Sequence, residues 1–123
     1  MDRLAAVRGV YERWERDDYR AGLELYDPEV RLEVHNPIPD AAIYQSVEGL
    51  QSYMRRFLTT WDEYHLEGVE FEENGDRVVV RVHHGGLGRA SGVRVAMDYY
   101  MAWTFKGDRV TRLDIGASPD VGA

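Results

Sequence analysis

Residues 64–84 read YHLEGVEFEENGDRVVVRVHH, and this stretch decides the fold. Apolar and polar side chains alternate on both sides of Asn74-Gly75. That dipeptide is the strongest short-range signal for a β-hairpin, because both of its turn positions favour a positive φ. The stretch therefore predicts two antiparallel strands, one from Tyr64 through Phe71 and one from Arg77 to His84.

The same two-residue period extends in both directions from this hairpin. Downstream, it predicts strands from Val93 to Phe105 and from Arg109 to Ile115, with a tight turn at residues 106–108. Upstream, residues 29–37 read EVRLEVHNP and alternate until Pro37, whose ring nitrogen cannot donate to a strand ladder. One early strand and four later strands are expected.

Three helices are predicted in the N-terminal half. The first begins near Asp2 and carries apolar residues at steps of three and four, ending at Trp14. Asp17 and Asp18 are interpreted as the cap of a short second helix that stops before Pro28. After the loop at residues 37–45, Ser46 caps the third and most amphipathic helix, whose stripe is Leu50, Tyr53, Met54, Phe57, Leu58 and Trp61. Early helices and late antiparallel strands predict an α+β domain with the sheet curled around the helices.

Length, charge and cysteine content exclude several classes of partner and chemistry. The 123 residues suit a single domain, and a net charge of -7 argues against nucleic acid as a partner. No apolar run approaches the ~20 residues that span a bilayer, and the N-terminal segment lacks a signal-peptide core, so we expect a cytoplasmic protein without a membrane partner. The absence of cysteine excludes thiolate chemistry and disulfides.

The paired histidines lie on opposite faces of their strand. Adjacent strand residues point in opposite directions, so His83 and His84 cannot both bind one metal ion, and no metal site is expected. Val78, Val80 and Val82 share the parity of His84. The valine face must be the inner one, which turns His84 inward and His83 outward.

Three residues are candidates for catalysis. His84 is a natural acid or base near neutral pH, although it could equally hydrogen-bond a ligand or fill the edge of the core. By parity, Tyr99 and Asn36 also face inward and could stabilise a developing oxyanion, although tyrosines in a sheet are more often packing residues. His35 and Asp98 fall on the outer face.

A second set of side chains could line a flat apolar ligand: Trp14, Tyr44, Met54, Trp61, Met101 and Trp103. An aromatic core is the alternative, and it is favoured for Trp14. The glycines of GGLGRASG, residues 85–92, match no phosphate-binding spacing and lie between antiparallel strands. They predict a flexible or bulged connection between strands.

Several segments resemble the SnoaL-like branch of the nuclear transport factor two-like superfamily, namely IYQSVEGLQSYMRRF, GDRVVVRV, GLGRASGV and AWTFKGDRVTRL. The order of the predicted elements is similar over nearly the whole chain. The resemblance implies a cone-shaped, curved antiparallel sheet wrapped around three helices, an enclosed apolar pocket and a homodimer. Members include ketosteroid isomerases, polyketide cyclases, dehydratases and proteins with no known activity, so the fold does not choose the reaction.

The known catalytic residues of that superfamily are not kept in place. Along the ketosteroid isomerases, the catalytic aspartate falls at Asn36, the protonated aspartate at Met101 and the oxyanion tyrosine near Val10. Along the polyketide cyclases, the catalytic aspartate falls near Ile115 and the pocket histidine at Met101. Both activities are therefore in doubt for this chain.

Three functional hypotheses follow. The first is a cofactor-free isomerase, cyclase or dehydratase that moves a proton on a small apolar carbonyl compound with His84. The second is a non-catalytic binder of a small hydrophobic ligand. The third is a dimeric association module whose outer sheet face, around Tyr100, matters more than its pocket.

Overall fold

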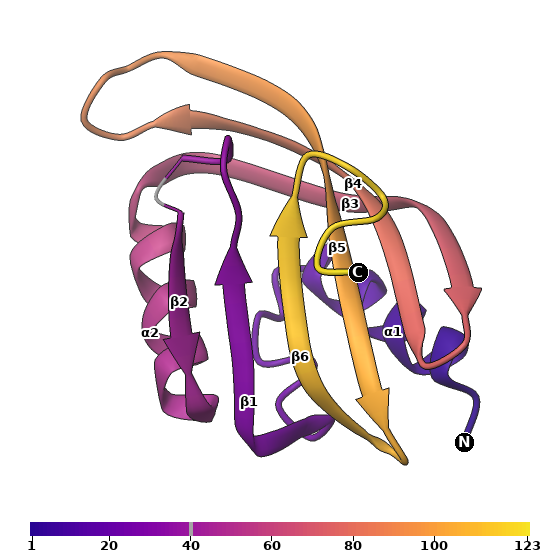
Figure 1. The fold of residues 1–123 in the computed structure, drawn as a ribbon. Coiled ribbons are helices and arrows are strands. Elements are labelled where there is room, and N and C mark those ends of the chain that lie inside the picture. The colour runs from indigo at the N-terminus through magenta and orange to yellow at the C-terminus, as the bar shows by residue number, and fades with distance from the viewer. Residues whose placement is uncertain (40) are drawn as a thin grey trace.

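The computed structural model describes residues 1–39 and 41–123, and Asp40, in the expected loop, lies outside the described residues. In chain order the elements are α1 (Arg3–Trp14), β1 (Tyr26–Val34), β2 (Ala42–Gln45), α2 (Ser46–Thr59), β3 (Trp61–Asn74), β4 (Arg77–Gly88), β5 (Arg94–Lys106) and β6 (Arg109–Gly116). The strands form one sheet in the order β2-β1-β6-β5-β4-β3. Both helices lie on one side of this curved sheet (Figure 1). The α+β class is confirmed.

The strands from β3 to β6 form the expected antiparallel meander. Gly75 has a φ of 64° in the first turn, and Asn74 pairs with Arg77 across it. β3 carries two register shifts, between Asp62 and His65 and between Gly68 and Glu70. Irregularities of this kind bend a strand and increase its twist, which helps β3 and β4 to curl over the helices.

The prediction of a second helix after Trp14 is wrong. The described chain between Trp14 and Tyr26 forms successive turns, in which the amides of Ala21, Leu23 and Leu25 bond to carbonyls three residues earlier. Asp17 and Gly22 have φ values of 64° and 98°, which a right-handed helix does not contain. Pro28, expected to follow the helix, lies within β1.

The prediction of a purely antiparallel sheet is also wrong. β1 runs parallel to β6, with Leu32 opposite Leu113 and Val34 opposite Ile115. Part of the expected loop forms β2, which pairs antiparallel with β1. The third helix begins one residue earlier than predicted, because Gln45 and not Ser46 is its N-cap, and Trp61 begins β3 instead of ending the helix.

Trp103 joins α1 to the sheet at the centre of the core. Its side chain is fully buried and stacks on Tyr26 with ring centroids 6.1 Å apart. Its indole N–H donates to the hydroxyl of Tyr11 at 3.0 Å, and that hydroxyl donates to the sulfur of Met101 at 3.1 Å. Among the described residues, neither helix is long and apolar enough to cross a membrane.

Replacing Trp103 with Ala should lower the free energy of unfolding by about 3–5 kcal/mol, because it leaves a large cavity and removes the indole N–H that donates to the Tyr11 hydroxyl. Trp61→Ala is the matched control, since Trp61 is only partly buried, and it should cost less than half as much. Urea denaturation of both variants measures the difference. Equal losses would contradict the central position of Trp103.

Candidate functional site

A cavity of about 330 Å³ lies between α2 and the inner face of the sheet. Helix α2 contributes Tyr53, Arg56 and Phe57 to its lining. The sheet contributes His84, Met97 and Tyr99, among others. Tyr44 from β2 and Trp61 from β3 complete an aromatic enclosure, so a cavity of this kind suits a small ring compound.

His84 is buried within this aromatic enclosure. Its side chain is 1% exposed. Four rings meet it at steep angles, with centroids 4.8 to 6.0 Å away: Trp61, Tyr64, Phe57 and Tyr99. Neither Nδ1 nor Nε2 has a hydrogen-bond partner among the described residues. An unpaired buried polar atom costs about 1–3 kcal/mol, so the arrangement favours a ligand that pairs with it.

Burial also sets the charge of His84. Desolvation disfavours the imidazolium and, with a smaller contribution from neighbouring His83, lowers the pKa of His84 from 6.5 to about 4. The ring is therefore neutral at pH 7. A neutral imidazole offers one donor and one acceptor to a ligand.

Tyr99 lies beside His84 on the same cavity wall. Burial raises the pKa of Tyr99 well above its ordinary value of 10.0, with a further contribution from Tyr53 and an opposing one from a hydrogen bond with Tyr64. The Tyr99 hydroxyl therefore keeps its proton at neutral pH. It can donate a hydrogen bond but cannot serve as a base.

The predicted ligand-binding residues divide into three groups. Tyr44 and Trp61 line the main cavity. Trp14, Met54 and Met101 line a void of about 30 Å³ that shares Tyr53, Phe57, Tyr99 and Ile115 with the main cavity. Contrary to expectation, Trp103 lies in the core, outside the lining of both spaces. The parity argument gave its direction but not the depth at which it packs.

Asn36 also departs from its expected place. It is exposed and lies outside the cavity lining. β1 ends at Val34, so strand alternation no longer fixes the direction of a side chain two residues later. The oxyanion role expected of Asn36 has no geometric support.

Sequence reasoning missed part of the lining. Tyr53 and Phe57 were on the predicted apolar stripe of the helix, where a core role was equally consistent. Nothing in the sequence indicated that Arg56 lines the cavity, because an arginine on a helix is usually solvated. Its guanidinium Nη1 donates to the Tyr44 hydroxyl at 3.3 Å, and this contact brings it to the cavity.

A separate groove of about 360 Å³ lies between the turns after α1 and the flank of α2. Trp14, Met54 and Arg55 are among the residues that line it. Of the buried side-chain atoms without a partner in the described chain, none belongs to this groove, whereas His84 and Trp61 each contribute to the main cavity. The main cavity is therefore the better candidate site.

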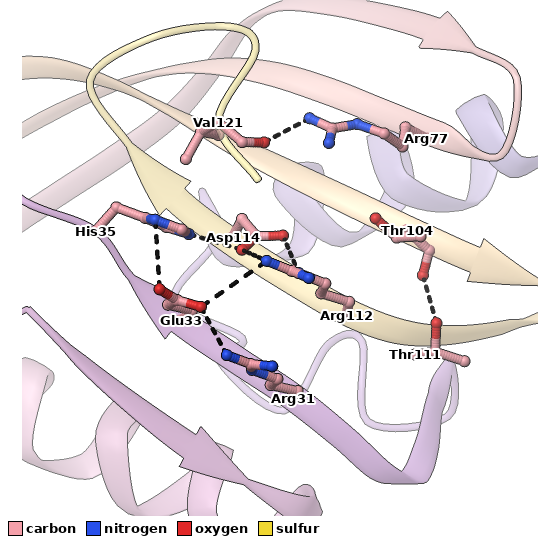
Figure 2. A network of polar contacts seen from close by, with 9 residues as sticks. All are labelled: Arg31, Glu33, His35, Arg77, Thr104, Thr111, Arg112, Asp114 and Val121. Carbon is pink, nitrogen blue, oxygen red and sulfur yellow. Dashed lines mark hydrogen bonds and ion pairs between the residues drawn. The ribbon is translucent and has the colours of Figure 1, made fainter. Parts of the chain in front are cut away.

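A polar network occupies the opposite face of the sheet, as Figure 2 shows. The His35 Nε2 atom lies 2.8 Å from Asp114 Oδ1, and Arg112 contacts both carboxylate oxygens of Asp114 at 2.7 and 3.1 Å. Glu33 bonds to Arg31 at 2.9 Å and lies 3.5 Å from His35 Nδ1. The C-terminal segment covers this face, where the carbonyl of Val121 accepts from Arg77 at 2.6 Å.

Glu33, His35 and Asp114 could in principle hold a metal ion, since their potential ligand atoms lie within 4.8 Å of one another. Arg112 and His35 already occupy the oxygens of Asp114, however, and Asp114 is fully buried. Two arginines beside two carboxylates disfavour an added cation. The group is best described as a partly buried ion-pair network centred on Asp114.

Asp114→Ala should destabilise the fold by about 2–3 kcal/mol, because it removes the buried carboxylate that bonds to the partly exposed side chains of Arg112 and His35. Asp98→Ala is a matched control on the same sheet face, where Asp98 contacts His83 at 2.7 Å and Arg81 at 2.9 Å in solvent. Water screens this exposed pair, so its loss should be much smaller. Similar thermal shifts for both variants would contradict a structural role for Asp114.

Acid should destabilise the protein through His84. The pKa of His84 is about 4 in the folded protein and 6.5 when unfolded, so the unfolded state binds more protons between these values. Its contribution to stability is complete above pH 6.5 and is lost as the pH falls towards 4. When the pH is lowered from 7 to 5, the free energy of unfolding, measured by denaturation, should fall by about 2 kcal/mol more in the wild type than in His84→Phe. His83→Phe should behave like the wild type, and identical slopes for all three would refute the buried neutral imidazole.

A curved α+β roll that encloses an aromatic cavity between a sheet and a long helix defines the class of NTF2-like proteins. The model of the SnoaL-like domain matches residues 7–113, and the chain belongs to this family. No curated protein matches the chain significantly.

Solved structures agree on the fold. An NTF2-like protein of unknown function from Burkholderia pseudomallei is 22% identical, with a TM-score of 0.79 over 94% of this chain and 89% of that chain. An NTF2-like protein from Burkholderia thailandensis is 19% identical, with a TM-score of 0.83 over 94% and 90%. TerC, co-crystallised with polyporic acid, is 20% identical, with a TM-score of 0.77 over 93% and 89%.

Proposed function

We propose that this SnoaL-like protein binds a small aromatic compound in the cavity beneath α2 and that His84 recognises a polar atom of that compound. The observation that carries this proposal is the buried imidazole, enclosed by four rings, with two nitrogens that have no partner in the described chain. A hydrophobic core alone gains nothing from such a group. A ligand that carries both a hydroxyl and a carbonyl group would form a hydrogen bond with each of the two nitrogens.

The size and packing of the cavity refine the proposal. Its volume of about 330 Å³ suits a compound of two or three rings, close to the lower bound of about 300 Å³ for small-molecule sites. Because His84 is only 1% exposed, a ligand reaches its nitrogens when a neighbouring ring turns aside. Phe57, Trp61 and Tyr64 are only partly buried, whereas Tyr99 is buried, so one of the first three is the ring that we expect to move. TerC, which shares the fold, was co-crystallised with polyporic acid.

Proton transfer is the second candidate, favoured by the neutral His84 and the protonated Tyr99 on one wall. The imidazole would take a proton from carbon while the electron pair moves onto the carbonyl oxygen, which Tyr99 would stabilise by donation. A base with a pKa of about 4 is weak, so it suits an already acidic carbon, such as one between two carbonyls. Isomerisation, cyclisation and dehydration can all begin in this way.

Non-catalytic binding is the alternative for the same cavity. None of its described lining residues is a carboxylate, and the exposed position of Asn36 removes one expected oxyanion donor. The association-module hypothesis and the expected homodimer stay predictions, with Tyr100→Glu as their test.

Binding is tested by titrating a panel of two- and three-ring hydroxyketones while recording the imidazole NMR signals of His84. Ligands that carry a hydroxyl and a carbonyl should move these signals, and His84→Phe should weaken their binding by at least about tenfold. His83→Phe, on the outer face, is the control and should bind normally. If no compound moves the His84 signals, the proposal fails.

Catalysis is tested by hydrogen-deuterium exchange at the central carbon of an aryl 1,3-diketone in D₂O. The proton-transfer reaction predicts exchange faster than buffer alone, rising with pH through about 4 and then levelling, as His84 loses its proton. His84→Phe should abolish the enhancement. A bound diketone that exchanges no faster than in buffer would identify a binder and exclude the proton-transfer candidate.

A further inference from the structure

We infer that the cavity selects an organic acid, an aromatic compound with a carboxylate or an ionised enol, and that Arg56 distinguishes this acid from its neutral analogue. The inference rests on the proposed function, because it concerns the ligand of the same cavity. The inference specifies that the ligand carries a negative charge and that Arg56 recognises this charge.

The charge of the lining supports this choice. Among the described residues that line the cavity, Arg56 alone carries a charge at neutral pH, since His84 is neutral and the others are aliphatic, aromatic, sulfur-containing or hydroxylated. No described carboxylate lies within 4.0 Å of the Arg56 guanidinium. A guanidinium is a permanent cation whose planar donors match a carboxylate.

The carbonyl of Arg56, in the last turn of α2, has hydrogen-bond partners other than a basic side chain. A basic residue in the last turn of a helix can stabilise the helix dipole and its free carbonyls. Here the carbonyl of Arg56 accepts instead from the hydroxyls of Thr59 at 3.0 Å and Thr60 at 2.9 Å. The guanidinium reaches across to β2, where it donates to Tyr44 at the cavity. It is thus held by a cavity residue and keeps donors available.

The unpaired polar atoms of the cavity point to the same ligand chemistry. Trp61 lines the cavity, and its indole N–H is buried without a partner among the described residues. Neutral His84 adds one N–H donor and one acceptor, so the buried unpaired atoms of the cavity in the described chain are two donors and one acceptor, and Arg56 adds further N–H groups. An ionised carboxylate or keto-enolate is rich in acceptors, so it satisfies this set where a neutral ester or hydrocarbon does not.

The test compares 1-hydroxy-2-naphthoate with its methyl ester, which share one ring system and differ in charge. By calorimetry at low salt, the wild type should bind the acid at least about tenfold more tightly than the ester. Arg56→Met should reduce that ratio below about threefold, because the acid loses the guanidinium that pairs with its charge. Arg55→Met, the adjacent arginine that lines the separate groove, should keep the full preference. Added salt should weaken binding of the acid alone.

The outcomes separate this inference from the proposed function. Equal affinity for acid and ester in the wild type, or an acid preference that survives Arg56→Met, overturns the role of Arg56. If His84 signals still move with the ester, the proposed function stands. If neither compound nor any hydroxyketone moves the His84 signals, both fail. NMR dispersion like that of the wild type confirms that each variant is folded.

Discussion

The register of β4 is the constraint on which the rest of the structure depends. Val78, Val80 and Val82 are fully buried in the core, and a register shift of one residue would turn all three towards the outer face of the sheet. His84 continues the same alternation and is therefore carried inward by the packing of the valines. The position of the candidate functional group is thus fixed by core energetics and not by its own interactions.

The sheet also separates two electrostatic environments. On the outer face, His35 and His83 each contact a carboxylate, Asp114 and Asp98 respectively. On the inner face, His84 lies among four aromatic rings, and neither of its nitrogens has a partner among the described residues. Alternation along a strand explains how two neighbouring histidines come to have such different surroundings. The outer histidines are each paired with a carboxylate, whereas the inner histidine has no hydrogen-bond partner in the described chain.

Local patterns succeeded where the chain alternates regularly and failed where backbone geometry is irregular. The Asn74-Gly75 hairpin and the inward direction of His84 agree with the structure because they depend on neighbouring residues only. The second helix fails because left-handed conformations at Asp17 and Gly22 interrupt it, although the aspartates resembled a helix cap. Asn36 fails because it lies beyond the last residue to which the alternation applies.

The sequence by itself determined the strand faces, the main hairpin and the α+β class, since side-chain period and turn chemistry act over a few residues. Only the tertiary structure decided that β1 pairs with β6 in parallel and that Asp114 becomes fully buried. It likewise decided that Phe57 closes on His84 and that Arg56 meets Tyr44 at the cavity. These contacts join residues far apart in the chain, so they depend on how whole elements pack, which no local pattern specifies.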